Sequence, residues 1–246
     1  MPVPQGFNDF SLYLISIQYA VYYLWCGLSL DLIEISIILV IPNFRPDTIN
    51  VDFLKYSGII PDGWELSNTP IMNNFQTQIT FSNKVKINAE NNRIIFTEAL
   101  GKDDKHKVPQ LSYQFIQSLN TANYQALGFN TNHLVVVSKD EDLARRYITE
   151  KLLKPGIWYK ASKEPMRASV NYYYTLDDCQ LNLNVSEARL QIPEQSPQSA
   201  LLFTSNYNYQ LQGETSFDKQ QNLIQTLEKY ESMIKKNQKI IYAFFN

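Results

Sequence analysis

The sequence predicts an α+β fold in which helices pack on one face of a curved antiparallel sheet. Aromatic residues, which favour strands, make up 13% of the 246 residues, with 16 Tyr and 13 Phe. Some segments alternate apolar and polar residues with a period of two, whereas others repeat apolar residues at helical spacing. The two kinds of segment follow each other in the same order twice, which predicts two halves packed as one globular unit.

The first half, residues 31–122, begins with a strand over 33–41, where Ile and Leu recur at every second position. Asn50 is suited to cap a short helix over 51–57, and Gly58 is suited to close it. Three further strands and a helix complete this half, over 75–81, 85–89 and 93–98 and from Pro109 onward.

The second half, residues 123–246, repeats the pattern with longer elements. Residues 124–137 are expected to form two short strands, or one strand broken at Asn130, Thr131 and Asn132. The segment 138–141 has the sequence of a capping box, which predicts that a helix follows it. Three strands and a long C-terminal helix capped by Ser216 come next, the strands over 167–175, 179–192 and 200–211.

Both halves therefore have the order strand, helix, three strands, helix. This order predicts a duplicated β-α-β-β-β-α unit, whose two sheets join edge to edge around a pseudo-two-fold axis. It is similar to the order in duplicated folds such as the saddle of the TATA-binding protein. The similarity is one of topology, without a residue-level repeat, and topology does not carry function.

Residues 1–30 are predicted to be an apolar N-terminal segment, with no charged residue from Phe10 to Leu30. Such a run is long enough to cross a bilayer as a helix, but Gln18, three Ser and four Tyr dilute its hydropathy. A signal peptide would require a basic residue before the apolar run, and none precedes this one. It is therefore expected to be a segment buried by the fold or a partner, a membrane anchor or surface helix, or a poorly packed extension.

The charge and cysteine content exclude several classes of protein. A net charge of −2 and a pI of about 5.8 argue against a general nucleic-acid binder, and from Val170 to Leu211 the only cation beside the Tyr-rich strands is Arg189. Two cysteines, Cys26 and Cys179, imply no disulfide framework and favour a reducing, cytoplasmic location, with membrane association as the alternative. The 8 Gly residues form no phosphate-binding motif, so no cofactor is expected.

No catalytic or metal-binding constellation is evident, so we expect a protein that is not an enzyme. His106 follows Asp103 and Asp104 in a charged loop, but a closed zinc site needs about four ligands at recognisable spacing. His133 is expected to be a polar turn residue. Cys179 follows acidic residues, which disfavour its thiolate.

Alternating amides indicate where the chain binds. Residues 180–185 and 205–212 alternate Asn or Gln with Leu or Tyr, a pattern typical of a sheet with one packed and one wet face. An uncharged face of Asn and Tyr suits contact with a protein partner or a second copy of the chain. We therefore expect a non-enzymatic binding or assembly protein that acts through protein–protein contacts.

Two alternatives stay open from the sequence. The first is a small-ligand-binding protein with an aromatic cleft between its two halves. The second is a membrane-associated factor anchored by residues 10–30. The candidate contact residues for a partner or a ligand are Trp64, Trp158, Tyr159, Tyr172, Tyr174, Tyr207 and Tyr209.

The segments SGIIPDGWEL, residues 57–66, and NYQALGFN, residues 123–130, resemble a family of uncharacterised conserved bacterial proteins of unknown function. The resemblance covers about the middle third of the chain. It implies a bacterial origin, and it implies neither an activity nor any site residue.

Overall fold

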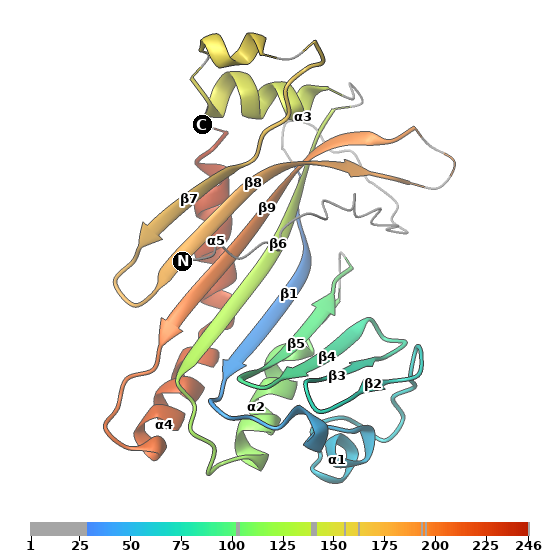
Figure 1. Cartoon of the computed structure of the whole chain (residues 1–246), viewed down its shortest axis with the longest axis vertical. Coiled ribbons are helices and arrows are strands. Elements are labelled where there is room, and N and C mark those ends of the chain that lie inside the picture. The colour runs from blue at the N-terminus through green and yellow to red at the C-terminus, as the bar shows by residue number, and fades with distance from the viewer. Residues whose placement is uncertain are drawn as a thin grey trace.

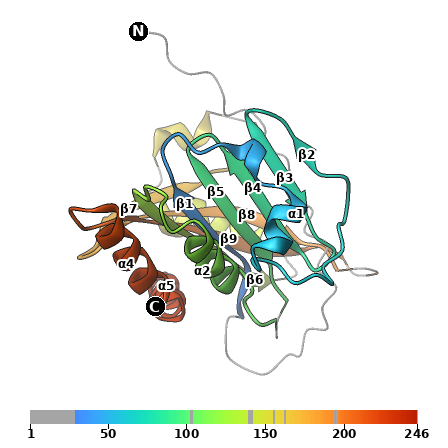
Figure 2. The same ribbon diagram turned by 90° about the horizontal axis from the view of Figure 1, so that it is seen from below.

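The computed structural model describes residues 29–101, 104–138, 142–154, 156–161, 163–192, 194 and 196–245, apart from the side chains of Ser138, Trp158 and Lys160. These residues form one nine-stranded antiparallel sheet. Figure 1 looks onto the sheet, with the α2, α4 and α5 helices behind it, and Figure 2 shows these helices together on one side. The predicted α+β class with an antiparallel sheet is confirmed.

The first half contains five strands and two α-helices among the described residues. They are β1 (Leu30–Val40), α1 (Val51–Tyr56), β2 (Ile71–Met72), β3 (Gln76–Thr80), β4 (Val85–Glu90), β5 (Arg93–Ala99) and α2 (Val108–Ser118). A 3-10 turn, Pro46–Thr48, precedes α1. The predicted caps of α1 are confirmed, because Asn50 Oδ1 accepts from the backbone N–H of Phe53 at 2.8 Å and Gly58 has a φ of 66°.

The second half has longer strands. They are β6 (Ala126–Ser138), β7 (Val170–Thr175), β8 (Gln180–Leu190) and β9 (Gln198–Gln210). Between β6 and β7 the chain forms α3 (Leu143–Arg146), a π-helix (Tyr147–Leu152) and a 3-10 turn (Ile157–Lys160). Two helices, α4 (Ser216–Leu227) and α5 (Tyr230–Tyr242), follow β9.

The two halves join at the centre of the sheet. The strand order is β2-β3-β4-β5-β1-β6-β9-β8-β7, with β1 and β6 antiparallel and Ile37 opposite Phe129. Counted outward from this pair, the first half runs β1, β5, β4, β3 and β2, and the second runs β6, β9, β8 and β7. The two-residue strand β2 has no counterpart among the described residues of the second half and is absent from the predicted unit. In both halves the first strand therefore pairs with the last, because the intervening helix places the chain at the outer edge before it returns.

The helix-covered face of the sheet holds the main hydrophobic core. Ile37 of β1 is fully buried there. In the first half Phe115 of α2 packs edge-on against Phe96 of β5, with ring centroids 5.4 Å apart. In the second half Phe244, just after α5, packs against Phe203 of β9 at 5.6 Å. Each fully buried side chain of this size contributes roughly 2 kcal/mol through its removal from water.

A buried carboxylate fixes the start of α2. Glu98, fully buried on β5, accepts from the backbone N–H of Lys107 at 2.7 Å and from that of Val108 at 3.3 Å. The ammonium group of Lys107 lies 2.5 Å from the other carboxylate oxygen. Since the first N–H groups of a helix have no partner within the helix, Glu98 supplies the acceptor that no local side chain provides.

A buried amide fixes α5 against the second half of the sheet. Asn237 donates through Nδ2 to Thr131 Oγ1 at 2.9 Å and faces His133 Nδ1 at 3.2 Å. Its Oδ1 accepts from the Tyr207 hydroxyl at 2.9 Å. His133 is fully buried rather than in a turn, and burial lowers the pKa of its imidazole to about 4.

The strand β6 is continuous, so the prediction of two short strands, or of one strand broken at Asn130, Thr131 and Asn132, is wrong. Asn130 pairs with Ser36 on one side and Asn206 on the other. The three residues look like a turn because Asn is depleted in strands. Here both Asn side chains lie on the face away from the helices, where amides can meet water.

The C-terminal helix differs from its prediction in two ways. Thr215, rather than Ser216, is the N-cap, and its hydroxyl and the carboxylate of Asp218 form a capping box with each other's backbone N–H groups. The helix is also interrupted at Glu228 and Lys229, which separate α4 from α5. The predicted capping box over 138–141 lies outside the described residues except for the backbone of its first residue.

The uncharged run over residues 10–30 lies outside the described residues except for its last two. No helix in the described part of the chain combines the length and hydropathy that crossing a membrane requires.

We predict that Glu98→Ala lowers the free energy of unfolding by about 3 kcal/mol, because it leaves the buried N–H of Val108 and the partly buried N–H of Lys107 without their acceptor. Urea titration followed by circular dichroism measures the loss. Glu90→Ala is the matched control, since Glu90 pairs with Arg93 at the surface and its loss costs about 0.5 kcal/mol or less. Equal effects of the two variants would contradict the assigned role of Glu98.

We predict that stability falls as the pH drops from the unfolded-state pKa of His133, about 6.5, to its folded-state pKa of about 4. The unfolded chain binds a proton in this window and the folded chain does not, so the stability is full above the window and declines by about 3 kcal/mol across it. His133→Gln should flatten this part of the urea-unfolding profile, whereas His106→Gln should leave it in place. A profile unchanged by His133→Gln would refute this.

Candidate binding surface

The face of the sheet away from the helices carries an array of amide side chains in the second half. Along β8 and β9, residues such as Leu183 and Tyr207 point into the core, so the residues that alternate with them point outward. We call this surface the amide face; its described residues are Asn130, Asn132, Asn171, Tyr173, Thr175, Gln180, Asn182, Asn184, Thr204, Asn206 and Asn208. None of these side chains is charged.

The strand register aligns these residues into rows across the sheet. The middle row runs over Tyr173, Asn182, Asn206 and Asn130, each the direct ladder partner of the next. It continues into the first half through Ser36. Neighbouring strands lie about 4.8 Å apart, so the row presents one polar group at each step of a strand spacing.

Hydrogen bonds hold part of this array in place. Asn184 Nδ2 donates to Asn171 Oδ1 at 3.0 Å. At the boundary with the first half, Asn132 Nδ2 donates to a carboxylate oxygen of Glu34 at 2.9 Å. These contacts restrict the amide rotamers before any partner arrives, which reduces the entropy cost of binding.

One acceptor in the middle of the array has no partner among the residues that the structure describes. Asn182 Oδ1 is buried and makes no hydrogen bond with the described residues. Beside it on β7, Tyr173 exposes 77% of its surface. The site thus combines an unpaired acceptor with an accessible ring, and an N–H or O–H donor of a partner can satisfy the acceptor.

A carboxyl group marks the boundary of the amide face. Glu34 lies in the irregular register of β1, where the strand is bulged next to Leu32. Burial raises the pKa of its carboxyl, while the positive charge of Lys86 and the hydrogen bond from Asn132 act in the opposite direction. The first half of the open face also carries Glu90 and Arg93, so the uncharged region is confined to the second half.

The predicted Tyr residues lie on the opposite face. Tyr207 and Tyr209 are buried in the main core, where their rings stack along β9 with centroids 6.5 Å apart. Tyr172 and Tyr174 are half-buried on the same side and stack at 6.4 Å, and Tyr172 also packs against Phe244. These rings pack on the helix-covered face of the sheet, so they do not lie on the amide face.

The other three predicted residues do not gather into a cleft among the described side chains. Trp64 is half-buried and packs edge-on against Phe81 of the first half at 5.1 Å. Tyr159 is half-buried on the 3-10 turn of the second half, and the side chain of Trp158 lies outside the described part.

Sequence reasoning missed Tyr173 and Glu34. Tyr173 could have been found, because period two places it opposite Tyr172 and Tyr174. Glu34 gave no signal, since its burial depends on the neighbouring strands.

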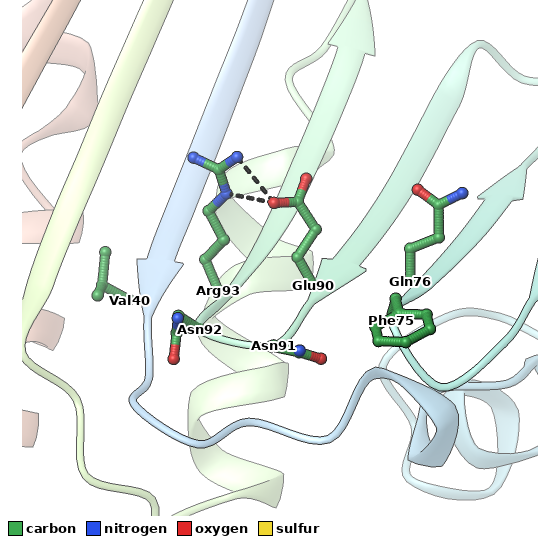
Figure 3. Close-up of a pocket in the computed structure, with 7 residues that line it drawn as sticks. All are labelled: Val40, Phe75, Gln76, Glu90, Asn91, Asn92 and Arg93. Carbon is green, nitrogen blue, oxygen red and sulfur yellow. Dashed lines mark hydrogen bonds and ion pairs between the residues drawn. The ribbon is translucent and has the colours of Figure 1, made fainter. Parts of the chain in front are cut away.

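Two of the surface depressions formed by the described residues lie elsewhere. The larger, of about 630 Å³, is formed by the β4–β5 hairpin and its neighbours (Figure 3), and its residues are Val40, Phe75, Gln76, Glu90, Asn91, Asn92 and Arg93. An exposed pair, Glu90 with Arg93 at 2.7 Å, crosses its rim. The second, of about 350 Å³, lies between α2 and the α4–α5 junction. Neither is lined by a predicted aromatic residue or by a nucleophile next to a base.

The side chains of Cys179 and His106 are packed against neighbouring residues. Burial raises the pKa of the Cys179 thiol, with the Asp178 charge acting in the same direction. His106 packs against the ring of Tyr230, with centroids 5.9 Å apart. Within the described ranges, no three His, Cys, Asp or Glu side chains cluster as metal ligands would. Cys26 and Asp103 lie outside these ranges.

No protein-family model matches this chain, and no curated protein matches it.

We predict that Glu34→Gln increases the free energy of unfolding at pH 7 relative to the wild type. A carboxyl whose pKa is raised on folding contributes stability at low pH, and this contribution is lost as the pH rises through its folded pKa, so removing the charge matters only at neutral pH. The difference should disappear in urea titrations at pH 3.5, about a unit below the ordinary Glu pKa of 4.5. Glu65→Gln, at an exposed position, is the control and should change stability at neither pH.

Proposed function

We propose that the protein is a non-enzymatic binding or assembly protein, and that the amide face contacts a protein partner. The observation that carries the proposal is the concentration of Asn in the middle of long strands. Asn is disfavoured in strands, so six Asn residues on β6, β8 and β9 reduce the intrinsic stability of the sheet. Departures from local propensity of this kind are typical of functional surfaces.

The chemistry of the amide face supports a protein partner. An amide both donates and accepts hydrogen bonds, so it can pair with a peptide backbone or a polar side chain of either kind. The exposed ring of Tyr173 adds the rigid aromatic contact that is enriched at protein interfaces. Since the surface carries no charge, the partner is expected to present a neutral, polar surface.

We also propose that the two halves derive from one duplicated β-α-β-β-β-α unit. Support comes from the matching order of strands outward from the β1–β6 pair and from the helices on one face. Superposition of residues 31–120 on 124–240 tests this. A best superposition that fails to align β1 with β6 and β5 with β9 would refute it.

A cytoplasmic location and a bacterial origin belong to this proposal as well. The buried thiol of Cys179, which forms no disulfide with the described residues, is compatible with a reducing compartment.

The test of the binding function is a comparative affinity capture from lysate of the source organism, with mass spectrometry of the bound proteins. We predict that Asn206→Glu, which places a charge in the middle row of the amide face, reduces capture of the specific partner by at least about tenfold. Gln78→Glu is the matched control, since it adds the same charge to the same face in the first half, and should retain the partner.

The proposal fails if the wild type captures no protein above background, or if both variants lose the partner equally. Circular dichroism of both variants confirms that any loss comes from the surface rather than from unfolding.

A further inference from the structure

The outermost strand of the second half has an open edge. No strand in the described part of the chain pairs with the outer side of β7, which lies at the left of the sheet in Figure 1. Native edge strands are usually protected by Pro, Lys, a bulge or a very short length. Residues Val170–Thr175 contain no Pro and no charge, and their register with β8 is regular.

The opposite edge of the sheet is protected. Its outermost strand, β2, has only two residues, Ile71 and Met72, and Pro70 directly precedes it. A two-residue strand offers too few backbone groups to template another strand. The contrast between the two edges indicates that the open edge of β7 is available to pair with another strand.

The hairpin between β7 and β8 determines which backbone groups face outward. The N–H of Leu176 donates to the carbonyl of Cys179 at 2.9 Å, so these two residues form a hydrogen-bonded pair. Hydrogen-bonded and non-hydrogen-bonded pairs alternate in an antiparallel ladder. The backbone N–H and C=O groups of Asn171, Tyr173 and Thr175 therefore face away from β8.

These three residues also share a side-chain face, because they alternate with the half-buried Tyr172 and Tyr174. They belong to the amide face, where Tyr173 is 77% exposed. A second β7 strand can form hydrogen bonds with the outward backbone groups of all three residues in an antiparallel arrangement. This requires that Asn171 lies opposite Thr175 of the other copy and that the two Tyr173 residues lie opposite each other. This register keeps every side chain of both copies on its proper face.

The charges that flank β7 select the antiparallel direction. Arg167 precedes the strand and is 61% exposed, although it also contacts Glu187 at 3.5 Å. Asp177 and Asp178 follow the strand at exposed positions. In an antiparallel pair, Arg167 of each copy approaches the two Asp residues of the other, whereas a parallel pair would bring like charges together.

We propose that a second copy of this chain pairs antiparallel with the open edge of β7, on a two-fold axis that passes between the two Tyr173 residues. The pairing forms one continuous sheet across the dimer and joins the two amide faces into a single surface. It goes beyond the proposed partner binding and does not require it, because self-association uses the backbone edge and partner binding uses the side-chain face.

The dimer is tested by sedimentation velocity of the full chain over a wide concentration range. The wild type should show reversible monomer–dimer association. Tyr173→Pro should raise the dissociation constant by roughly tenfold or more, because it removes an outward-facing donor at the centre of the interface. Proline is tolerated at an edge position whose N–H faces solvent, so the ladder with β8 is retained. Tyr173→Thr keeps the N–H and should change the constant less than Tyr173→Pro does.

Charge reversal tests the direction of pairing. Arg167→Asp and Asp178→Arg should each weaken the dimer. The two substitutions in one chain should restore pairing in part, because the carboxylate at position 167 again meets a cation at position 178, whereas Asp177 is unchanged. Amide hydrogen exchange gives an independent measurement. The amides of Asn171, Tyr173 and Thr175 should become protected as the concentration of the wild type rises.

A wild type that stays monomeric at all concentrations would overturn the proposal, as would a Tyr173→Pro variant that associates like the wild type. If the proline variant loses its circular dichroism signal, Tyr173→Lys replaces it, since two lysines across the axis repel each other. Dimers that survive Tyr173→Lys, or a double charge reversal that fails to restore pairing, count against the β7 interface.

Discussion

The antiparallel pairing of β1 with β6 is the constraint on which the rest of the structure depends. It joins the halves through a ladder from Leu30 opposite Val135 to Val40 opposite Ala126. Because side chains alternate along a strand, this register decides which residues of both halves meet the helices. A slip of one residue would bury Asn130 and expose Phe129, so the hydrophobic pattern and the ladder support each other.

The same alternation explains why the two faces differ so strongly. Polar groups on the helix-covered face need specific partners, and Asn237 provides them for Thr131 and Tyr207. The open face can use water or a partner protein, so it tolerates Asn at positions where a core would not. The amide face therefore lowers the strand propensity of its segments. Among its described residues, it leaves a single buried polar side-chain atom without a hydrogen bond, the Oδ1 of Asn182.

The periodicity of apolar residues and the capping residues made the helices and strands predictable. The face of the sheet on which each side chain lies depends on tertiary contacts, so the candidate site was not predictable in the same way. Asn50 and Gly58 mark α1 because their roles are local. The spacing of Tyr207 and Tyr209 places them on one face, but only the packing of α5 shows that this face is inside. The break at Glu228 could not be predicted, since neither it nor Lys229 disfavours a helix.

The two halves share a strand order, yet they present different chemistry. The first half has a protected edge and carries Lys86, Glu90 and Arg93 on its open face, as a solvated surface does. The second half has an open edge and an uncharged face, and the two features meet on β7, where Tyr173 belongs to both. If a single sheet had no function beyond folding, its two ends would need the same protection from association. The asymmetry is therefore explained most simply by contacts that the second half makes and the first does not.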